Sequence, residues 1–249
     1  MAQLRVGISK INRYASRDSG DTVEVVERPS GGLSVVVADA QGTGLAAKLL
    51  SNLVTSKAVA LLKEGARETA VHEAAHDHLY HYKGGRVSCT LATISVDTRQ
   101  RCCSLTLNSP APAYLLLDGE IVSVEDQTPP LGITPGLSPQ HVSVPLEPGV
   151  WMVVVTDGVS AAGSRTGQQV DLGVEISRHL QTAAEPVALA RCVLEDAVRR
   201  DQGRPADDMT VVVLGVVGDD VPNEHRTMEV RVPLRADMLH NSEELSNGC

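Results

Sequence analysis

Four aspartates recur in one setting along the chain, each at the end of an apolar run and beside a small residue or another acid. Small and β-branched side chains fit a sheet that is covered on both faces, so the run 35–38 predicts a buried strand. Carboxylates gathered at strand ends raise one another's pKa unless a cation neutralises them. Mg²⁺ or Mn²⁺ suits such a set, because hard ions prefer oxygen ligands. The four acids are Asp21, Asp39, Asp157 and Asp207.

Small residues follow two of these acids, in the pairs Asp39-Ala40 and Asp157-Gly158. Such residues leave the neighbouring backbone carbonyls open to solvent or to a metal ion. Two divalent ions a few ångströms apart can share a water, lower its pKa and direct it at phosphorus. One strand-end aspartate is common in α/β proteins for structural reasons, but four in one chain indicate metal-assisted hydrolysis.

Periodicity and turn signals predict the elements that must position these acids. Strands 22–27 and 33–38 are joined by a Pro- and Gly-containing hairpin turn, which places Asp21 beside Asp39. The four strands between 88 and 124 are separated by short polar turns and indicate an antiparallel meander. The other strands are expected at 4–8, 141–144, 151–156 and 209–217, and helices at 45–62, 68–82, 174–182 and 186–200.

Composition indicates a soluble globular chain. The 249 residues suffice for one large domain with a real core, and the absence of Phe means that Val, Leu, Ile and Ala must build it. A formal charge of −9 argues against nucleic acid as the main partner. No apolar run of membrane-spanning length and no signal-peptide core are evident, so we expect no membrane partner. The five cysteines are odd in number and lack CxxC spacing, which indicates reduced thiols and a cytoplasmic location.

The chain changes character near residue 218. We expect a catalytic domain over residues 1–217 and a polar extension over 218–249. Within the extension, residues 228–234 are a candidate edge strand, and residues 241–249 have a composition typical of disorder.

Four short motifs, taken in order, resemble one known family. They are Ser19-Gly20-Asp21 and the segments 37–44, 155–159 and 207–210. In this order and context they resemble the metal-dependent PPM (type 2C) serine/threonine phosphatases, most closely the SpoIIE-like bacterial branch. Within that branch the chain is similar to the stand-alone, RsbX-like phosphatases of stressosome and anti-sigma partner-switching pathways. The resemblance covers roughly residues 4–217.

The resemblance implies an α/β fold, a four-layer α-β-β-α sandwich with two central, mainly antiparallel sheets. It also implies two Mn²⁺ or Mg²⁺ ions. Asp39 would bridge both ions, with the backbone carbonyl of Ala40 contributing. Asp21 would serve one ion, and Asp157 and Asp207 the other. A metal-bridging hydroxide would attack phosphoserine or phosphothreonine in line, without a covalent phospho-enzyme, and Asp39 and Asp157 would be the catalytic residues.

The same resemblance assigns supporting roles. Asp208 occupies the place of a polar residue that supports the metal ligands, and Gly158 adjoins Asp157. A phosphate-binding arginine is expected near the N-terminus, and both Arg13 and Arg17 are candidates for it. The chain departs from the family at Thr43, where His is frequent.

The implied substrate is a phosphorylated STAS-domain protein, either a stressosome scaffold subunit or an anti-sigma-factor antagonist. A phosphate on such a protein is a charge switch that changes which partner binds, so its removal would reset the signal. The sequence does not assign a pathway or an oligomeric state.

Two other functions compete with this interpretation. A pseudophosphatase would bind a partner without hydrolysis, and the extension after residue 218 is a candidate docking strand for a partner. The segment His72-Glu73-Ala74-Ala75-His76 matches the HExxH pattern of zinc proteases on an expected helix. On the phosphatase interpretation this helix lies in an outer layer, and its histidines form a solvated face that binds Ni²⁺ or Zn²⁺ only adventitiously. Cys102 and Cys103 lie within an expected strand and are interpreted as structural cysteines.

Overall fold

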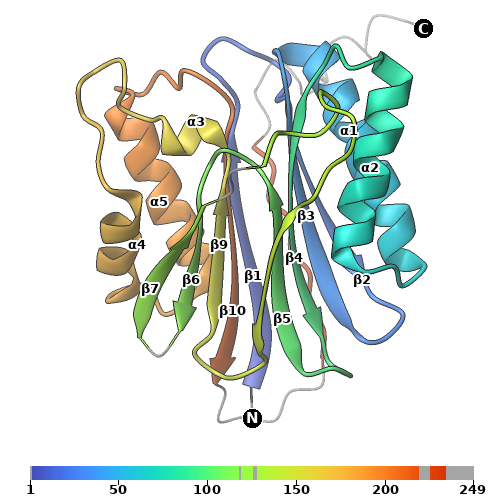
Figure 1. Cartoon of the computed structure of the whole chain (residues 1–249). Helices are drawn as coiled ribbons and strands as arrows, with labels where there is room; N and C mark the ends of the chain where they lie inside the picture. Colours follow the sequence, from blue (N-terminus) through green and yellow to red (C-terminus); the bar gives the residue numbers. More distant parts are fainter. Residues whose placement is uncertain (1, 118, 126–127, 219–224, 234–249) are drawn as a thin grey trace, which may run out of the picture. The chain divides into compact units, whose positions relative to one another are not determined.

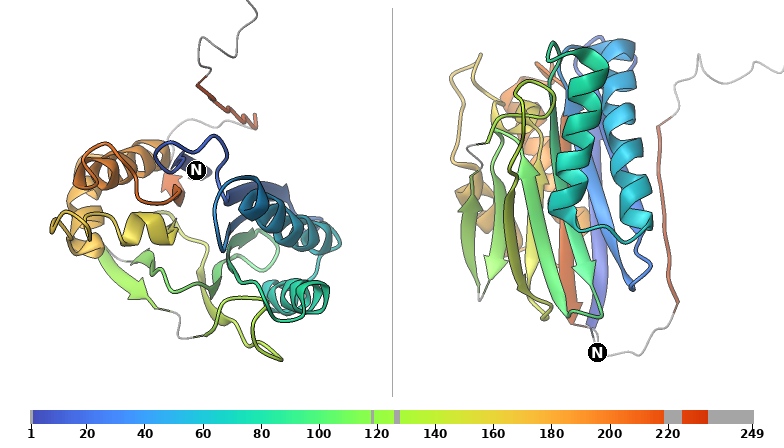
Figure 2. Two further views of the ribbon diagram at one scale, coloured as in Figure 1. Left: turned by 90° about the horizontal axis from the view of Figure 1, so that it is seen from above. Right: turned by 45° about the vertical axis from the view of Figure 1, so that its right-hand side comes forward.

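The computed structural model of the chain describes residues 2–117, 119–125, 128–218 and 225–233. Residues 2–219 form one compact unit. In its described part, ten strands make two five-stranded sheets and five helices cover the outer faces of those sheets. The layers are helix, sheet, sheet, helix, as Figure 2 shows from above. The predicted four-layer sandwich is confirmed.

All paired strands in the two sheets are antiparallel. The first sheet has the order β1 (Ala2–Ile11), β10 (Met209–Gly218), β9 (Trp151–Val155), β6 (Ala113–Leu117) and β7 (Glu120–Val124). The second has the order β2 (Asp21–Glu27), β3 (Gly32–Ala40), β4 (Cys89–Asp97), β5 (Cys102–Asn108) and β8 (Gln140–Pro145). The central strands are almost continuous runs of buried β-branched residues, because both faces of each sheet are covered.

Alternation along β3 shows how the sequence builds the layers. Val35 and Val37 point into the core between the sheets, whereas Val36 and Ala38 point outward under the helices. The helices α1 (Gly44–Lys63) and α2 (Glu68–Lys83) cover this second sheet. The first sheet is covered by α3 (Asp157–Ser160), α4 (Leu172–Leu180) and α5 (Pro186–Arg200).

The predicted meander is wrong. The pairs β4–β5 and β6–β7 are both hairpins, but they belong to different sheets. The chain crosses between the layers at residues 109–112, a segment that contains Pro110 and Pro112 and therefore lacks two ladder donors. Turn signals in the sequence identify each hairpin but not the sheet that it joins.

Element limits differ from the predictions by a few residues. The first strand extends over ten residues, because β1 pairs along its whole length with β10. Helix α4 begins earlier than predicted, since the Asp171 side chain accepts a hydrogen bond from Val174 N at 3.2 Å and caps it there. The predicted edge strand is not found over residues 225–233, which contain neither helix nor strand. Leu234 and residues 241–249 lie outside the described residues.

By length and hydropathy alone, one helix in the described part of the chain, α1, is apolar enough to cross a membrane. The sequence analysis expected none. Its buried residues, which include Ala47, Val54, Ala58 and Leu62, pack against the second sheet and α2. A helix that covers a sheet in this way needs a wide apolar stripe, which explains its hydropathy.

Candidate active site

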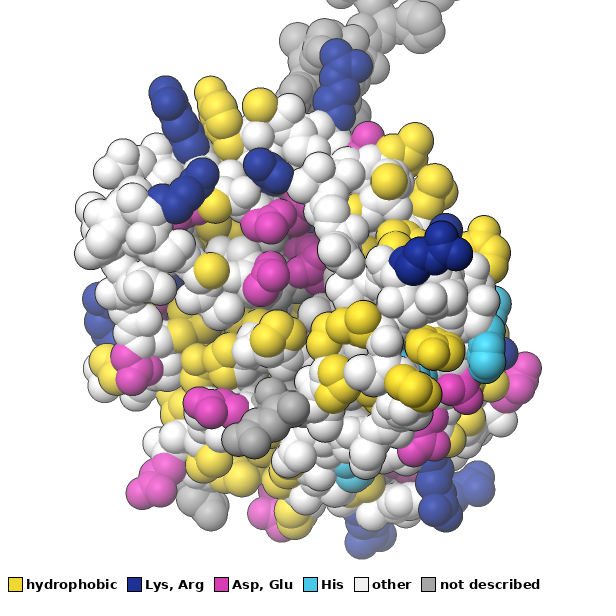
Figure 3. Space-filling view, turned by 45° about the horizontal axis from the view of Figure 1, so that its top comes forward, with side chains coloured by type: hydrophobic (Ala, Val, Ile, Leu, Met, Phe, Trp, Pro, Cys, Tyr) yellow, Lys and Arg dark blue, Asp and Glu magenta, His cyan; other side chains and the backbone are white. Residues whose placement is uncertain are grey.

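The four predicted aspartates come together at one end of the two sheets, uppermost in Figure 1. Asp21 opens β2 and pairs in register with Asp39 near the end of β3. Asp157 follows β9 directly and begins α3, and Asp207 lies just before β10. Pairing of Val155 with Val211 brings these last two chain segments side by side. Figure 3 shows acidic side chains gathered in a hollow on this face, with Lys and Arg side chains beside them.

Asp39 is the central acid of the group. Burial raises its pKa to about 10, with further contributions from Asp21, from Asp157, with which it shares a hydrogen bond, and from Asp207. A carboxyl with this pKa gives up its proton at neutral pH only if positive charge is brought to it. The other three acids therefore all lie close enough to Asp39 to raise its pKa, and the four form one cluster.

Asp21 links the two sheets through its side chain. It is fully buried, and its Oδ2 accepts hydrogen bonds from Thr156 Oγ1 at 3.1 Å and Thr210 Oγ1 at 2.5 Å. Its Oδ1 is buried and has no hydrogen-bond partner. Burial raises the pKa of Asp21 to about 6, against the lowering effect of the two hydroxyls and Lys10. One oxygen is thus fixed by the protein and the other is left available.

Asp208 forms hydrogen bonds with the backbone around the site. Its Oδ1 accepts from Arg13 N at 2.8 Å and its Oδ2 from Gly20 N at 2.7 Å. Its own N–H donates to Asp207 Oδ1 at 2.9 Å. Burial raises the pKa of Asp207, and this hydrogen bond and the charge of Arg13 oppose the rise. Asp208 therefore connects the loop before β2 to the segment that carries Asp207.

The small residues of the pattern have different uses. Ala40 is the buried last residue of β3, and its carbonyl oxygen lies at the acid end of the sheets, near Gly20. Gly158 is required by packing, since a Cβ there would overlap the carbonyl oxygen of Asp208. The sequence interpretation of Gly158, an open carbonyl beside the metal, missed this close approach.

The two arginine candidates separate in the structure. Arg13 is exposed, yet its charge acts on Asp207, so its guanidinium is near the acids. Arg17 is also exposed, and its carbonyl accepts a hydrogen bond from Asn12; in the described part of the chain no contact joins its side chain to the acids. Two lysines that the sequence analysis missed, Lys10 and Lys48, donate to the Asp21 carbonyl oxygen. Nothing in their sequence context singles them out, because only the topology brings β1 and α1 to β2.

These residues fit a pair of hard divalent cations. The donor set consists of carboxylate and carbonyl oxygens, which Mg²⁺ and Mn²⁺ prefer. The unpartnered Asp21 Oδ1 and the strongly raised pKa of Asp39 are what such a site shows before positive charge compensates it. The chemistry of the donor set and its burial thus agree with the predicted cofactor class.

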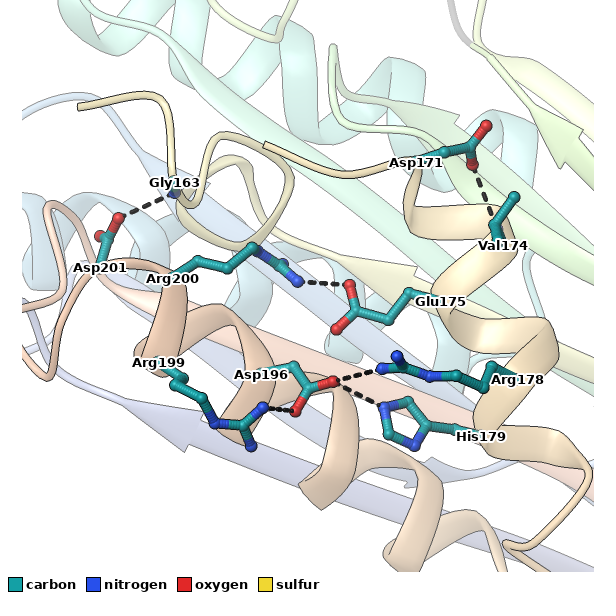
Figure 4. A network of polar contacts seen from close by, with 10 residues as sticks. All are labelled: Gly163, Asp171, Val174, Glu175, Arg178, His179, Asp196, Arg199, Arg200 and Asp201. Atoms are coloured by element: carbon teal, nitrogen blue, oxygen red, sulfur yellow. Dashed lines mark hydrogen bonds and ion pairs between the residues drawn. The ribbon is translucent and has the colours of Figure 1, made fainter. Parts of the chain in front are cut away.

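A second group of ligand-type side chains lies between α4 and α5. Among the described residues, it is the group whose ligand atoms all lie within 4.8 Å of one another; the strand-end acids are spread more widely. Figure 4 shows that its two carboxylates already have cationic partners. Asp196 is bonded by Arg178, His179 and Arg199, and Glu175 by Arg200. Three guanidinium groups balance two carboxylates without a metal ion, so we interpret this group as a network that joins the two helices.

The histidines of the HExxH segment do not form the predicted solvated face. His72 and His76 are buried, at 0% and 1% exposure, because they lie on the face of α2 that packs against the sheet. His72 Nδ1 bonds Asn108 Oδ1 at 2.8 Å, and its Nε2 bonds Thr93 Oγ1 at 3.0 Å. Both nitrogens of His72 are therefore used, which leaves no zinc ligand there. In the sequence, the only sign that this face of α2 is buried is the four-residue spacing of the apolar residues Ala75 and Leu79.

We expect His72 to make the protein sensitive to acid. Burial lowers its pKa to about 4, from 6.5 in the unfolded chain. The unfolded state therefore takes up a proton first, and stability present above pH 6.5 is lost as pH falls toward 4, by ~3 kcal/mol in total. Urea unfolding at pH 7.5, 6 and 4.5 should show this loss in the wild type and a smaller one in His72→Gln. Equal pH dependence in the two proteins would contradict it.

The cysteines agree with a structural role. Cys89 and Cys103 are buried, Cys102 and Cys192 are half-buried, and all four are free thiols. Burial and the neighbouring Cys102 raise the pKa of Cys103 to about 11, so its reactive thiolate form is scarce. Cys249 lies outside the described residues.

Comparison with known proteins gives consistent relatives. A family model described as Stage II sporulation protein E (SpoIIE) matches residues 29–217. Stage II sporulation protein E of Bacillus subtilis is 22% identical over 229 residues, which cover 92% of this chain and 27% of that protein. The chain thus spans about a quarter of the length of this curated relative.

Solved structures share the fold. The PP2C phosphatase domain of Bacillus subtilis SpoIIE, solved with a fragment of its regulatory domain, has a TM-score of 0.74 at 20% identity and covers 86% of this chain and 63% of that one. A structure from studies of the bacterial stressosome has a TM-score of 0.66 at 20% identity, covering 85% and 99%. The catalytic domain of the serine/threonine phosphatase PstP, in complex with two manganese ions, has a TM-score of 0.67 at 21% identity, covering 88% and 100%.

Proposed function

Because the chain belongs to the SpoIIE family, whose PP2C phosphatase fold it shares, we propose that it hydrolyses phosphoserine or phosphothreonine on a protein. The predicted family is confirmed by the family model that matches residues 29–217. The observation that carries the proposal is that three aspartates, from the ends of separate strands, meet around a fourth, Asp39. We assign the activity to residues 1–217 and treat residues 218–249 as an extension.

The aspartates would hold two Mn²⁺ or Mg²⁺ ions. Asp39 would bridge them, Asp157 and Asp207 would serve one ion, and Asp21 and the Ala40 carbonyl would serve the other; the closeness of the four acids supports this assignment. When bound, such ions neutralise phosphate charge and lower the pKa of a water near phosphorus. The relative PstP, crystallised with two manganese ions, supports this number.

The protein's own groups orient that site. The hydroxyls of Thr156 and Thr210 fix one oxygen of Asp21, so its free oxygen is held in one direction. Asp208 holds the backbone at Arg13, whose guanidinium is the better candidate to receive the substrate phosphate. Arg17 is the weaker candidate, because no contact within the described residues joins its side chain to the acids.

The proposed substrate is a phosphorylated STAS-domain protein of a stressosome or an anti-sigma switch, encountered in the cytoplasm. This assignment is supported by the family and by the likeness to a structure from the bacterial stressosome. Removal of a phosphate that acts as a charge switch would restore the partner choice of the unmodified protein.

The deciding experiment measures release of inorganic phosphate from phosphoserine and phosphothreonine peptides. Full-length protein is stripped of metal and supplied with Mn²⁺, Mg²⁺ or Zn²⁺. We expect turnover with Mn²⁺ or Mg²⁺ that is lost in Asp157→Asn and kept in Asp77→Asn, a matched change at an exposed site on α2. Turnover that survives in Asp157→Asn, or that requires Zn²⁺ alone, would overturn the proposed centre. Binding of Mn²⁺ without turnover on a phosphorylated STAS protein would indicate a pseudophosphatase.

A further inference from the structure

Two lysine ammonium groups converge on one backbone atom at the edge of the acid cluster. Lys10 Nζ donates to the carbonyl oxygen of Asp21 at 2.8 Å, and Lys48 Nζ donates to the same oxygen at 2.9 Å. Lys48 also donates to Thr22 Oγ1 at 2.9 Å. Lys10 comes from β1 in the first sheet and Lys48 from α1, which covers the second. The two ammonium groups thus come from different layers of the fold, and hydrogen bonds hold both in place.

Both charges lie on the Asp21 side of the cluster. The pKa of Lys10 is lowered by burial and by the charge of the nearby Lys48. The negative charges of Asp21, Asp208 and Asp39 oppose this change. These interactions show which groups surround it. Arg13, the cation near Asp207, differs because no hydrogen bond within the described residues holds its guanidinium in place.

We propose that Lys10 and Lys48 are built-in counter-cations that make the two metal sites unequal. This rests on the proposed metal centre. A divalent ion held by Asp39, Asp157 and Asp207 would take no ligand from Asp21, the residue whose carbonyl binds both ammonium groups. An ion held by Asp21 and the Ala40 carbonyl would share Asp21 with both ammonium groups, and like-charge repulsion in a partly buried site would weaken its binding. The lysines at the same time partly neutralise the acids when metal is scarce.

A purely structural role for the lysines makes a different prediction. Loss of a hydrogen bond to the Asp21 carbonyl would lower the melting temperature with and without metal and leave metal affinity unchanged. Loss of a counter-cation lowers the melting temperature of the metal-free protein but tightens the weaker metal site. Metal affinity therefore separates the two roles.

The test is calorimetric titration of metal-stripped, full-length protein with Mn²⁺. We expect two unequal binding steps in the wild type. In Lys48→Gln and Lys10→Gln, which keep a hydrogen-bond donor and remove the charge, the weaker step should tighten about tenfold or more, with the tighter step unchanged within about twofold. Lys48→Arg, which keeps the charge, should behave as the wild type, and so should Lys57→Met, further along the same helix.

Two equal steps in the wild type, or a weak step that neither glutamine variant changes, would overturn the inference and leave the proposed phosphatase standing. Absence of any Mn²⁺ binding would instead overturn the metal centre itself, and this inference with it. If Lys48→Gln fails to fold, Lys10→Gln decides the question alone, because Lys10 is an exposed residue at the end of β1.

Discussion

Asp39→Asn is expected to lose phosphatase activity by at least about 10³-fold while the metal-free protein becomes more stable. Asp39 is the acid whose pKa the other three raise, and it is the proposed bridge between the metal ions. An amide in its place has no charge and only one ligating oxygen, so it is a poor bridge between two cations. Folding of the wild type near pH 8 must instead either bury this carboxylate or protonate it.

The sign of the stability change follows from the raised pKa. A carboxyl with a folded-state pKa of about 10 and an ordinary unfolded value gives stability that is full below pH 4 and is lost as pH rises toward 10. Asparagine has no such dependence. The gain of Asp39→Asn should therefore grow with pH and reach ~2 kcal/mol or more by pH 8.

Urea unfolding in the presence of a chelator, at pH 5 and pH 8, measures this difference, and phosphate release with Mn²⁺ measures activity. Asp77→Asn, an exposed change on α2, is the control and should alter neither quantity. An active Asp39→Asn enzyme would rule out the bridging role. An inactive variant that is less stable at both pH values would mean that Asp39 holds the fold rather than the metal.

The acid cluster was predictable because the signals for it lie in short stretches of sequence next to each aspartate. Each aspartate follows or precedes a run of branched apolar residues, and register pairing of Asp21 with Asp39 follows from one hairpin. Four motifs in a fixed order then imply that the remaining strand ends meet at the same edge. The layered fold was predicted from the family resemblance, and the continuous apolar run from Val35 to Ala38, which the structure divides between two cores, agrees with it.

The features that escaped prediction depend on contacts between distant segments. Lys10 and Lys48 belong to different layers, and only the completed fold brings them to Asp21. His72 was predicted to lie on a solvated face, because the sequence around a helical histidine does not show whether its side chain is buried. Its partners, Asn108 and Thr93, come from strands of the sheet beneath. Hairpins β4–β5 and β6–β7 look alike in sequence, although they belong to different sheets.

Contacts at Asp21 explain why the site and the joining of the two sheets are linked. Its backbone carbonyl receives Lys10 from β1, and its side chain receives Thr156 and Thr210 from the ends of β9 and β10. All three partners belong to the first sheet or its end, whereas Asp21 belongs to the second. A change in the spacing of the sheets therefore moves Asp21 relative to Asp157 and Asp207. Small packing changes at this end should affect catalysis more than their distance from phosphorus suggests.

Gly158→Ala is the change that tests this link most strongly. A Cβ at this position would overlap the backbone carbonyl of Asp208 and come within 3.3 Å of Met209 Cγ. Backbone cannot turn aside as a flexible side chain can, so α3 and the segment 207–209 must move apart. Because Asp157 lies on one of these segments and Asp207 on the other, the separation displaces two proposed ligands of the same ion.

We expect Gly158→Ala to lower stability by ~3 kcal/mol and kcat/KM by about 10²-fold or more, with Mn²⁺ affinity at the tighter site weakened as well. Gly218→Ala is the matched control, because a Cβ there meets no atom within 4 Å and its backbone is not in the left-handed region. Unfolding, Mn²⁺ titration and peptide turnover should be measured on both variants. A stable Gly158→Ala protein with normal turnover would show that the α3 contact does not set the separation of Asp157 from Asp207. A folded variant that loses metal affinity and turnover in parallel would show that packing of one glycine against a backbone carbonyl holds that distance.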